Sequence, residues 1–216
     1  MMFNKTHAAC AAALVALLAA GCASQPSPDE LDRQAVAVIR SAFRAEGIAK
    51  LDRLDQDFAN EACSKAQGAP LPEGLSKAIE EASLQTVKAP TNGKYLGDWK
   101  EGEKIAQSGR GLTFTDDAKV VNGGNCYNCH QITQQEIAFG TIGPSLYNYG
   151  KLRGVTDPAS AEAKPMVEYT WGKLWNARAY NACSHMPRFG HKGLLDEAQI
   201  RDLMALLLDP KSPVNQ

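Results

Sequence analysis

The chain has 216 residues, of which 44% are hydrophobic and 22% are charged, and its formal net charge is −1. These values are ordinary for a globular protein and exclude a chain that is disordered throughout. They also argue against a nucleic-acid-binding protein, which would carry a basic excess. Six cysteines are too few for a disulfide scaffold of this length, so each cysteine needs its own explanation.

Residues 1–22 have the pattern of an export signal. Lys5 precedes an apolar run from Ala8 to Ala20, which is too short to span a bilayer but suits a signal peptide. The small residues directly before Cys22 resemble a bacterial lipoprotein cleavage site, at which Cys22 would be acylated. Cleavage after Ala23 is the alternative and would discard Cys22. Both cleavage sites predict export to an oxidising compartment, the periplasm. A membrane contact is expected only if Cys22 is retained and acylated.

The exported chain is predicted to be all-α with long loops. Residues 29–67 carry apolar side chains at helical spacing on both sides of Gly47, so residues 23–70 are interpreted as a tether followed by a helical hairpin. The main domain is expected over residues 71–216. Strand-like alternation and internal repeats are lacking.

Two helices of the main domain are marked by local signals. Residues 73–84 have an amphipathic pattern. Asp196 is expected to cap a final helix that runs through Leu208 and stops before Pro210.

Cys126-Tyr127-Asn128-Cys129-His130 is a C-x-x-C-H motif, the attachment motif for c-type haem. Two thiols three residues apart can add to the two vinyl groups of one haem, and the next residue then places an imidazole under the iron. A structural zinc site would need a second ligand pair, and a thioredoxin-like motif would lie in a βαβ pattern. Because both are lacking, the motif predicts one covalently attached haem c with His130 as an iron ligand.

The sixth iron ligand must come from another segment. Met186 is predicted to be this ligand, because Pro187 can hold its loop rigid just before the final helix. The neighbouring His185 is the alternative and would give a lower reduction potential. The other candidates are Met166, His191 and Met204. Met204 lies in the apolar stripe of the final helix, so core packing is its expected role, and a surface position is the alternative for His185 and His191.

Further residues are candidates for supporting roles around the haem. The segment from Gly143 to Leu146 resembles a loop of class I cytochromes c, which implies that the backbone carbonyl of Pro144 accepts a hydrogen bond from His130 and fixes the ring tautomer. An ordinary turn is the alternative. Arg153 and Arg188 are candidates for pairing with the haem propionates, with a solvated surface role as the alternative. Cys63 and Cys183 are predicted to form a disulfide, with a free, reactive Cys183 as the alternative.

Several stretches of the chain resemble the SoxX family, the monohaem c-type subunit of the SoxAX thiosulfate-oxidising complex. They are residues 124–131 around the C-x-x-C-H motif, 140–146 (GTIGPSL), 149–154 (YGKLRG), 183–190 (CSHMPRFG) and 208–214 (LDPKSPV). The resemblance covers residues 71–216 and leaves residues 23–70 without a counterpart.

The resemblance implies a class I cytochrome c fold with His130 and Met186 as axial ligands. It implies a heterodimer with the larger cytochrome SoxA, which contains the reaction centre of an L-cysteine S-thiosulfotransferase. Thiosulfate would be oxidatively joined to a cysteine of the carrier protein SoxYZ, and the haem of this chain would pass the released electrons to a downstream cytochrome. A stand-alone periplasmic electron carrier is the alternative function.

Overall fold

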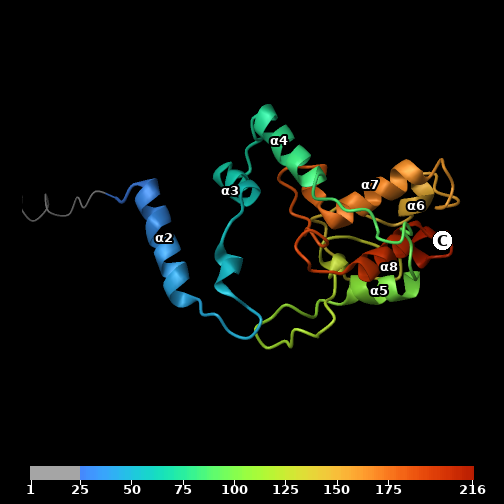
Figure 1. Ribbon diagram of the computed structural model, residues 1–216, viewed down its shortest axis with the longest axis horizontal. Coiled ribbons are helices and arrows are strands. Elements are labelled where there is room, and N and C mark those ends of the chain that lie inside the picture. The colour runs from blue at the N-terminus through green and yellow to red at the C-terminus, as the bar shows by residue number, and fades with distance from the viewer. Residues whose placement is uncertain (1–24) are drawn as a thin grey trace, which may run out of the picture. The chain divides into compact units, whose positions relative to one another are not determined.

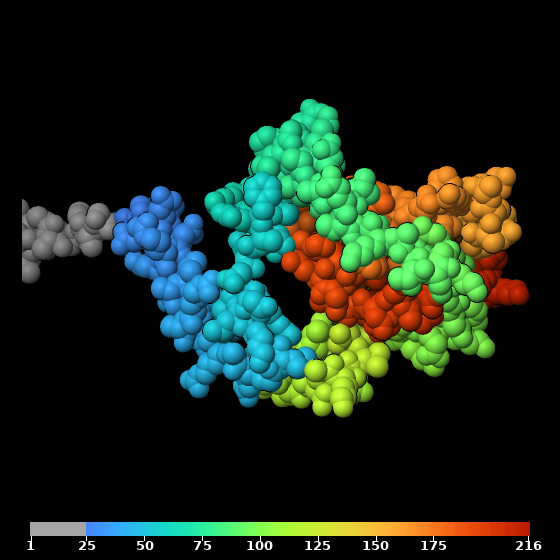
Figure 2. All heavy atoms as spheres, in the orientation of Figure 1, coloured from blue at the N-terminus to red at the C-terminus, as the bar shows by residue number. Residues whose placement is uncertain are grey.

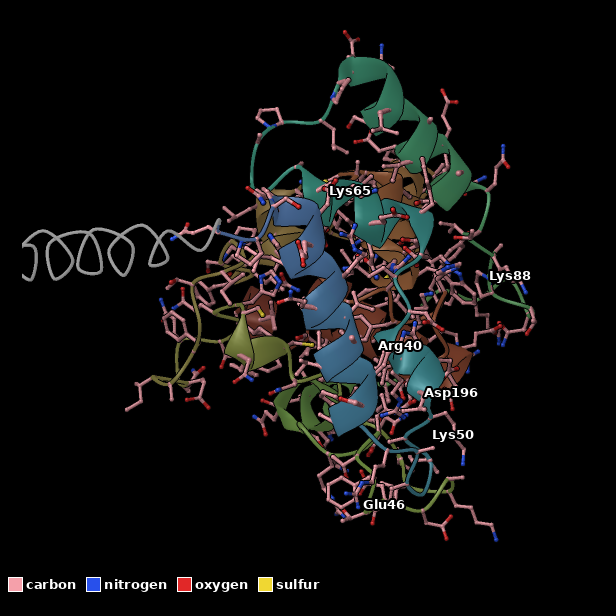
Figure 3. The ribbon with its side chains drawn as sticks, turned by 90° about the vertical axis from the view of Figure 1, so that its left-hand side faces the viewer. Arg40, Glu46, Lys50, Lys65, Lys88 and Asp196 are labelled. Atoms are coloured by element: carbon pink, nitrogen blue, oxygen red, sulfur yellow. A yellow bond between two sulfur atoms is a disulfide. The ribbon has the colours of Figure 1, made fainter. Side chains whose placement is uncertain are left out.

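The computed structural model describes residues 25–216, and their regular structure is helical, with an isolated bridge between Glu46 and Ala49 (Figures 1 and 3). The all-α class predicted from the sequence is therefore confirmed. The α-helices are α2 (Pro28–Ala42), α3 (Phe58–Lys65), α4 (Glu73–Leu84), α5 (Trp99–Gln107), α6 (Tyr149–Leu152), α7 (Lys164–Trp175) and α8 (Glu197–Leu208). The 3₁₀ turns are η1 (Leu51–Leu54), η2 (Cys126–Asn128), η3 (Ala177–Ala179) and η4 (Pro213–Asn215).

The chain divides into two units after Arg44. The described part of the first unit contains α2, which begins at Pro28 after an N-cap by Ser27 and has no buried residue. Within residues 25–216, no helix has both the length and the apolar character needed to cross a membrane. The export signal and Cys22 lie outside the described residues.

The second unit begins at Ala45, which differs from the boundary near residue 71 expected from the sequence. Residues 45–55 lie against residues 110–120 (Figure 2), and the Arg53 guanidinium donates a hydrogen bond to the backbone carbonyl of Leu112. The second helix of the predicted hairpin, after Gly47, is two segments, η1 and α3, because the Asp57 side chain caps a new helix at Phe58. Residues 45–70 therefore belong to the same compact unit as residues 71–216.

Helices α5 and α8 lie side by side and form one wall of the core (Figure 1). A Cβ at Gly102 of α5 would lie 2.2 Å from the backbone oxygen of Asp202 in α8, so only glycine permits this close approach. The Asp202 carboxylate also accepts a hydrogen bond from the Asp98 amide at 2.8 Å, which places the start of α5. Asp196 caps α8 as predicted, together with Gln199 in a capping box.

The core sits around α7 and α8. Trp171 of α7 is 1% exposed and donates its indole N–H to the Lys88 carbonyl at 2.7 Å, which fastens the loop after α4. The C-terminal turn η4 closes the other end, where the Asn215 side chain accepts from the Gly150 amide at 2.9 Å. The buried side chains of α8 are Ile200, Leu203, Met204, Ala205, Leu206, Leu207 and Leu208. Apolar area buried by these two helices supplies much of the driving force for folding.

Candidate haem-binding site

A cavity of about 640 Å³ lies beside α7 and α8 and is lined by segments from across the second unit. Its walls include the three reactive residues of the C-x-x-C-H motif, Gly143 and Pro144, and the segment from Cys183 to Pro187. Leu203, Leu206 and Leu207 of α8 add an apolar wall. The volume falls within the usual range for cofactor sites, about 300–1,000 Å³. The fold therefore brings the predicted haem-attachment and ligand segments to one cavity.

The cysteine pair of the motif lies in this cavity as free thiols. Burial raises the pKa of the Cys126 thiol to about 12. A redox-active C-x-x-C pair needs the opposite, a cysteine whose pKa is lowered by a positive charge or a helix N-terminus. The raised pKa of Cys126 is therefore unlike that of a redox-active C-x-x-C pair.

The imidazole of His130 is held by the segment that follows the motif. Its Nδ1 lies 2.7 Å from the backbone oxygen of Pro144, which is the predicted hydrogen bond. Because a carbonyl can only accept, Nδ1 carries the proton and Nε2 is left with a lone pair for a metal. A Cβ at Gly143 would lie 2.1 Å from Cε1 of His130, so the glycine lets the backbone pack directly against the ring.

The structure separates the candidates for the second axial ligand. His185 and Met186 both line the cavity, whereas Met166, His191 and Met204 are not among its lining residues. Met204 is fully buried within α8 as part of the core. The Met186 side chain is half-buried, while His185 is exposed. The lining of the cavity therefore leaves His185 and Met186 as the candidates for the second axial ligand.

The two candidate propionate partners have different surroundings. Arg153 lines the cavity, and its guanidinium lies 3.8 Å from the centroid of the Tyr149 ring. Arg188 is not among the lining residues, and its Nη2 lies 2.7 Å from Oδ2 of Asp57. The proposed propionate role of Arg188 is therefore not supported, because an acid from the N-terminal segment of the second unit already neutralises it.

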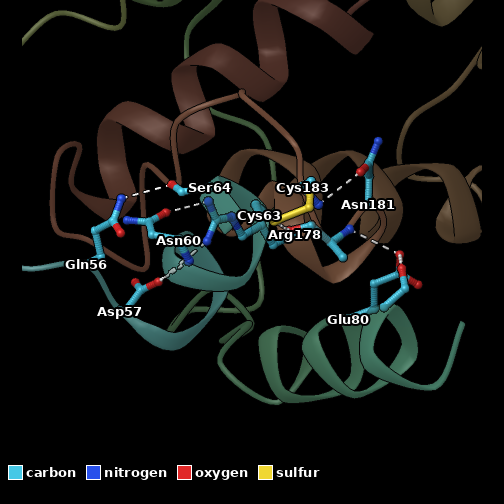
Figure 4. The surroundings of a disulfide bond; sticks show 11 residues. Gln56, Asp57, Asn60, Cys63, Ser64, Glu80, Arg178, Asn181 and Cys183 are labelled. Atoms are coloured by element: carbon cyan, nitrogen blue, oxygen red, sulfur yellow. Dashed lines mark hydrogen bonds and ion pairs between the residues drawn. A yellow bond between two sulfur atoms is a disulfide. The ribbon is translucent and has the colours of Figure 1, made fainter. Parts of the chain in front are cut away.

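Cys63 and Cys183 form the predicted disulfide, with their Cα atoms 5.5 Å apart (Figure 4). This bond joins α3 to the segment that carries Met186. Cys183 itself lines the cavity, so the disulfide lies at its wall. The alternative of a free Cys183 is not found.

Asp57 is a residue that the sequence analysis missed. Its carboxylate faces three cations, at 2.7 Å from Arg188, 3.1 Å from Lys192 and 3.5 Å from Arg178. A signal for it exists in the sequence, because residues 169–195 contain four cations and no Asp or Glu. An acidic partner for these cations must therefore lie in another segment of the chain, and the sequence does not identify that segment.

The residues present fit a haem c. Two free thiols at the required spacing, an imidazole with an available Nε2 and a thioether donor all border one cavity of cofactor size. Among the described residues, no group of three or more His, Cys, Asp or Glu side chains is arranged to hold a metal ion directly.

Comparison with known proteins agrees with this reading of the site. Residues 115–210 match the cytochrome c family. The chain is also 36% identical over 169 residues to a protein of Aquifex aeolicus described as an uncharacterized lipoprotein, with 74% of this chain and 73% of that protein covered. The matched region contains the C-x-x-C-H motif, the Pro144 segment and the Met186 segment. The chain therefore belongs to the cytochrome c family and is an electron-transfer protein with a covalently attached haem c.

Proposed function

We propose that His130 and Met186 are the axial ligands of the haem iron. When bound, haem c supplies reversible one-electron redox chemistry. The hydrogen bond from His130 Nδ1 to Pro144 fixes the ring and keeps Nε2 available. Met186 is favoured over His185 because its side chain is the less exposed of the two and lies at the same cavity. With both axial positions filled by side chains, the site would transfer electrons and would not bind a substrate at the iron.

We further propose that the chain is the electron-accepting subunit of a SoxAX-type complex. The support is the resemblance of the C-x-x-C-H, Gly143-Pro144, Met186 and C-terminal segments to SoxX. In this role the partner is a larger SoxA-type cytochrome that contains the reaction centre. It joins thiosulfate oxidatively to a cysteine of a SoxYZ-type carrier protein. Two electrons are released for each new sulfur–sulfur bond, and this chain passes them on, one at a time, to a downstream c-type cytochrome.

The proposed location is the periplasmic side of a membrane, with a lipid on Cys22. The support is the run of small residues before Cys22 and the description of the Aquifex aeolicus relative as a lipoprotein. Cytochromes c typically work outside the cytoplasm, which agrees with an export signal.

The meeting of the C-x-x-C-H motif and the Met186 segment at one cavity is the observation that carries the proposed ligation. The SoxAX role depends on the resemblance to SoxX. The test is to purify the chain from its native membrane and soluble fractions and to stain the gel for haem. A second, larger haem protein in equal amount, together with reduction of this haem on addition of thiosulfate and the carrier protein, would support the SoxAX role. A monomer that exchanges electrons with a cytochrome but ignores thiosulfate would overturn it in favour of a stand-alone electron carrier.

A further inference from the structure

The segment that carries Met186 is fastened on both sides by the short helix α3. Cys183, three residues before Met186, is bonded to Cys63 in α3. Arg188, two residues after Met186, pairs with Asp57 at the start of α3 at 2.7 Å. Figure 4 shows Asp57 at the N-terminal end of the short helix that contains Cys63. We call Asp57 and Cys63, with these two attachments, the α3 clamp.

The ionic side of the clamp is largely enclosed. The side chains of Arg178 and Arg188 are only 10% and 12% exposed, so they need a nearby counter-charge. The 169–195 segment has no acidic residue of its own. Asp57 meets this need with both carboxylate oxygens, since Oδ1 faces Arg178 and Oδ2 faces Arg188 and Lys192. Asn60 of α3 also accepts from Arg178.

The remaining contacts of the segment give it less support. Between Cys183 and Arg188, the hydrogen bonds are local, from the Ser184 amide to Asn181 and from the Met186 amide to the Ser184 hydroxyl. Just before Cys183, the Ala182 amide donates to Glu80 of α4 at 3.1 Å. After Arg188, Phe189 is buried at the cavity wall. Met186 itself packs, partly buried, against the core, and the two clamp attachments are the covalent and ionic links closest to it on either side.

We propose that the α3 clamp positions Met186 on the iron, and that opening its disulfide makes the iron accessible to an external ligand. This inference rests on the proposed ligation by Met186. A dithiol is the chemical class of reductant required. It gives two electrons and two protons to the Cys63–Cys183 bond, which becomes two thiols, while the dithiol becomes a cyclic disulfide. With one side released, the segment loses its covalent link to α3 and Met186 leaves the iron more often.

The test measures the rate at which carbon monoxide binds to the ferrous holoprotein, because this ligand enters only when the sixth position opens. Ascorbate reduces the haem without opening disulfides. The same protein is then treated with a dithiol, and thiols are counted to show that the bond has opened. We expect carbon monoxide to bind at least about tenfold faster after the treatment, which corresponds to about 1.4 kcal/mol.

Three variants separate positioning from general destabilisation. Cys63→Ser combined with Cys183→Ser removes the bond and leaves no thiol at position 183 to compete for the iron. Asp57→Asn keeps a side-chain acceptor for the Asn60 amide but removes the charge that faces Arg188. Glu61→Gln is the matched control, because Glu61 is on the same helix and pairs with the exposed Lys65 instead of the Met186 segment. We expect faster binding in the first two variants and the wild-type rate in the control.

The outcomes distinguish the clamp from the ligation on which it rests. If the wild type excludes carbon monoxide and both clamp variants and the dithiol-treated protein exclude it equally well, the clamp is overturned while ligation by Met186 stands. If the untreated wild type binds as fast as Met186→Ala, ligation by Met186 is overturned, and the clamp with it. Should the double serine variant fail to incorporate haem, the dithiol treatment of folded protein decides the question.

Discussion

Gly143 leaves no space for a methyl group beside His130. In Gly143→Ala the new Cβ would begin 2.1 Å from Cε1 and 2.5 Å from Nδ1 of the ring. An ordinary contact needs at least 3.4 Å, so the ring must retreat by about 1.3 Å. A shift of that size disrupts the bond from Nδ1 to Pro144, which is now 2.7 Å long. Overpacking costs about 1–3 kcal/mol and the lost hydrogen bond about 1 kcal/mol, so we expect a loss of about 2–4 kcal/mol.

The assay is guanidinium unfolding of the holoprotein, together with a redox titration. Gly74→Ala is the matched control, because a Cβ there meets nothing within 4 Å and the position is helical. The control should be as stable as the wild type or slightly more stable. The reduction potential of Gly143→Ala should rise, since an imidazole without its Nδ1 hydrogen bond is a weaker donor to ferric iron. A variant within 0.5 kcal/mol of the wild type, as surface changes usually are, and with an unchanged potential would refute the reasoning.

Three further predictions concern other parts of the second unit. Gly102→Ala should lower the melting temperature more than Gly74→Ala, because its Cβ would press on α8 at 2.2 Å; equal melting temperatures would contradict this. Burial raises the pKa of the Asp57 carboxyl, but hydrogen bonds from the Asn60 amide, Arg188 and Lys192 outweigh it and hold the pKa well below the usual 3.8. Its stabilisation is therefore fully present above pH 3.8 and is lost as the pH falls below this value, and urea unfolding of Asp57→Asn should show a shallower acid loss than the wild type. Met204→Leu should keep the methionine–iron charge-transfer band in the ferric spectrum and lose under about 1.5 kcal/mol, whereas Met186→Leu should abolish the band.

Some residues of the haem-binding site could be predicted from the sequence, and others could not. The cysteine pair and His130 are adjacent in the chain, and the chemistry of haem attachment requires that adjacency, so one short motif is sufficient. The role of Pro144 was predicted from the resemblance of its loop to class I cytochromes c, and the hydrogen bond to His130 is present. The sequence left Arg188 between a haem propionate and a surface role, and the ion pair with Asp57 that the structure shows was not predicted.

The sequence by itself determined the all-α class, the covalent haem c and the bounds of α4 and α8. Helical periodicity, caps and the C-x-x-C-H spacing are local properties, which are present before the chain folds. Only the tertiary structure decided that Asp57 neutralises Arg188 and that the second unit begins at Ala45. Such contacts join residues as far apart as Cys63 and Cys183, at a separation of 120 positions. These contacts form because apolar side chains are buried and buried charges are paired over the whole unit, and a local sequence pattern does not contain this information.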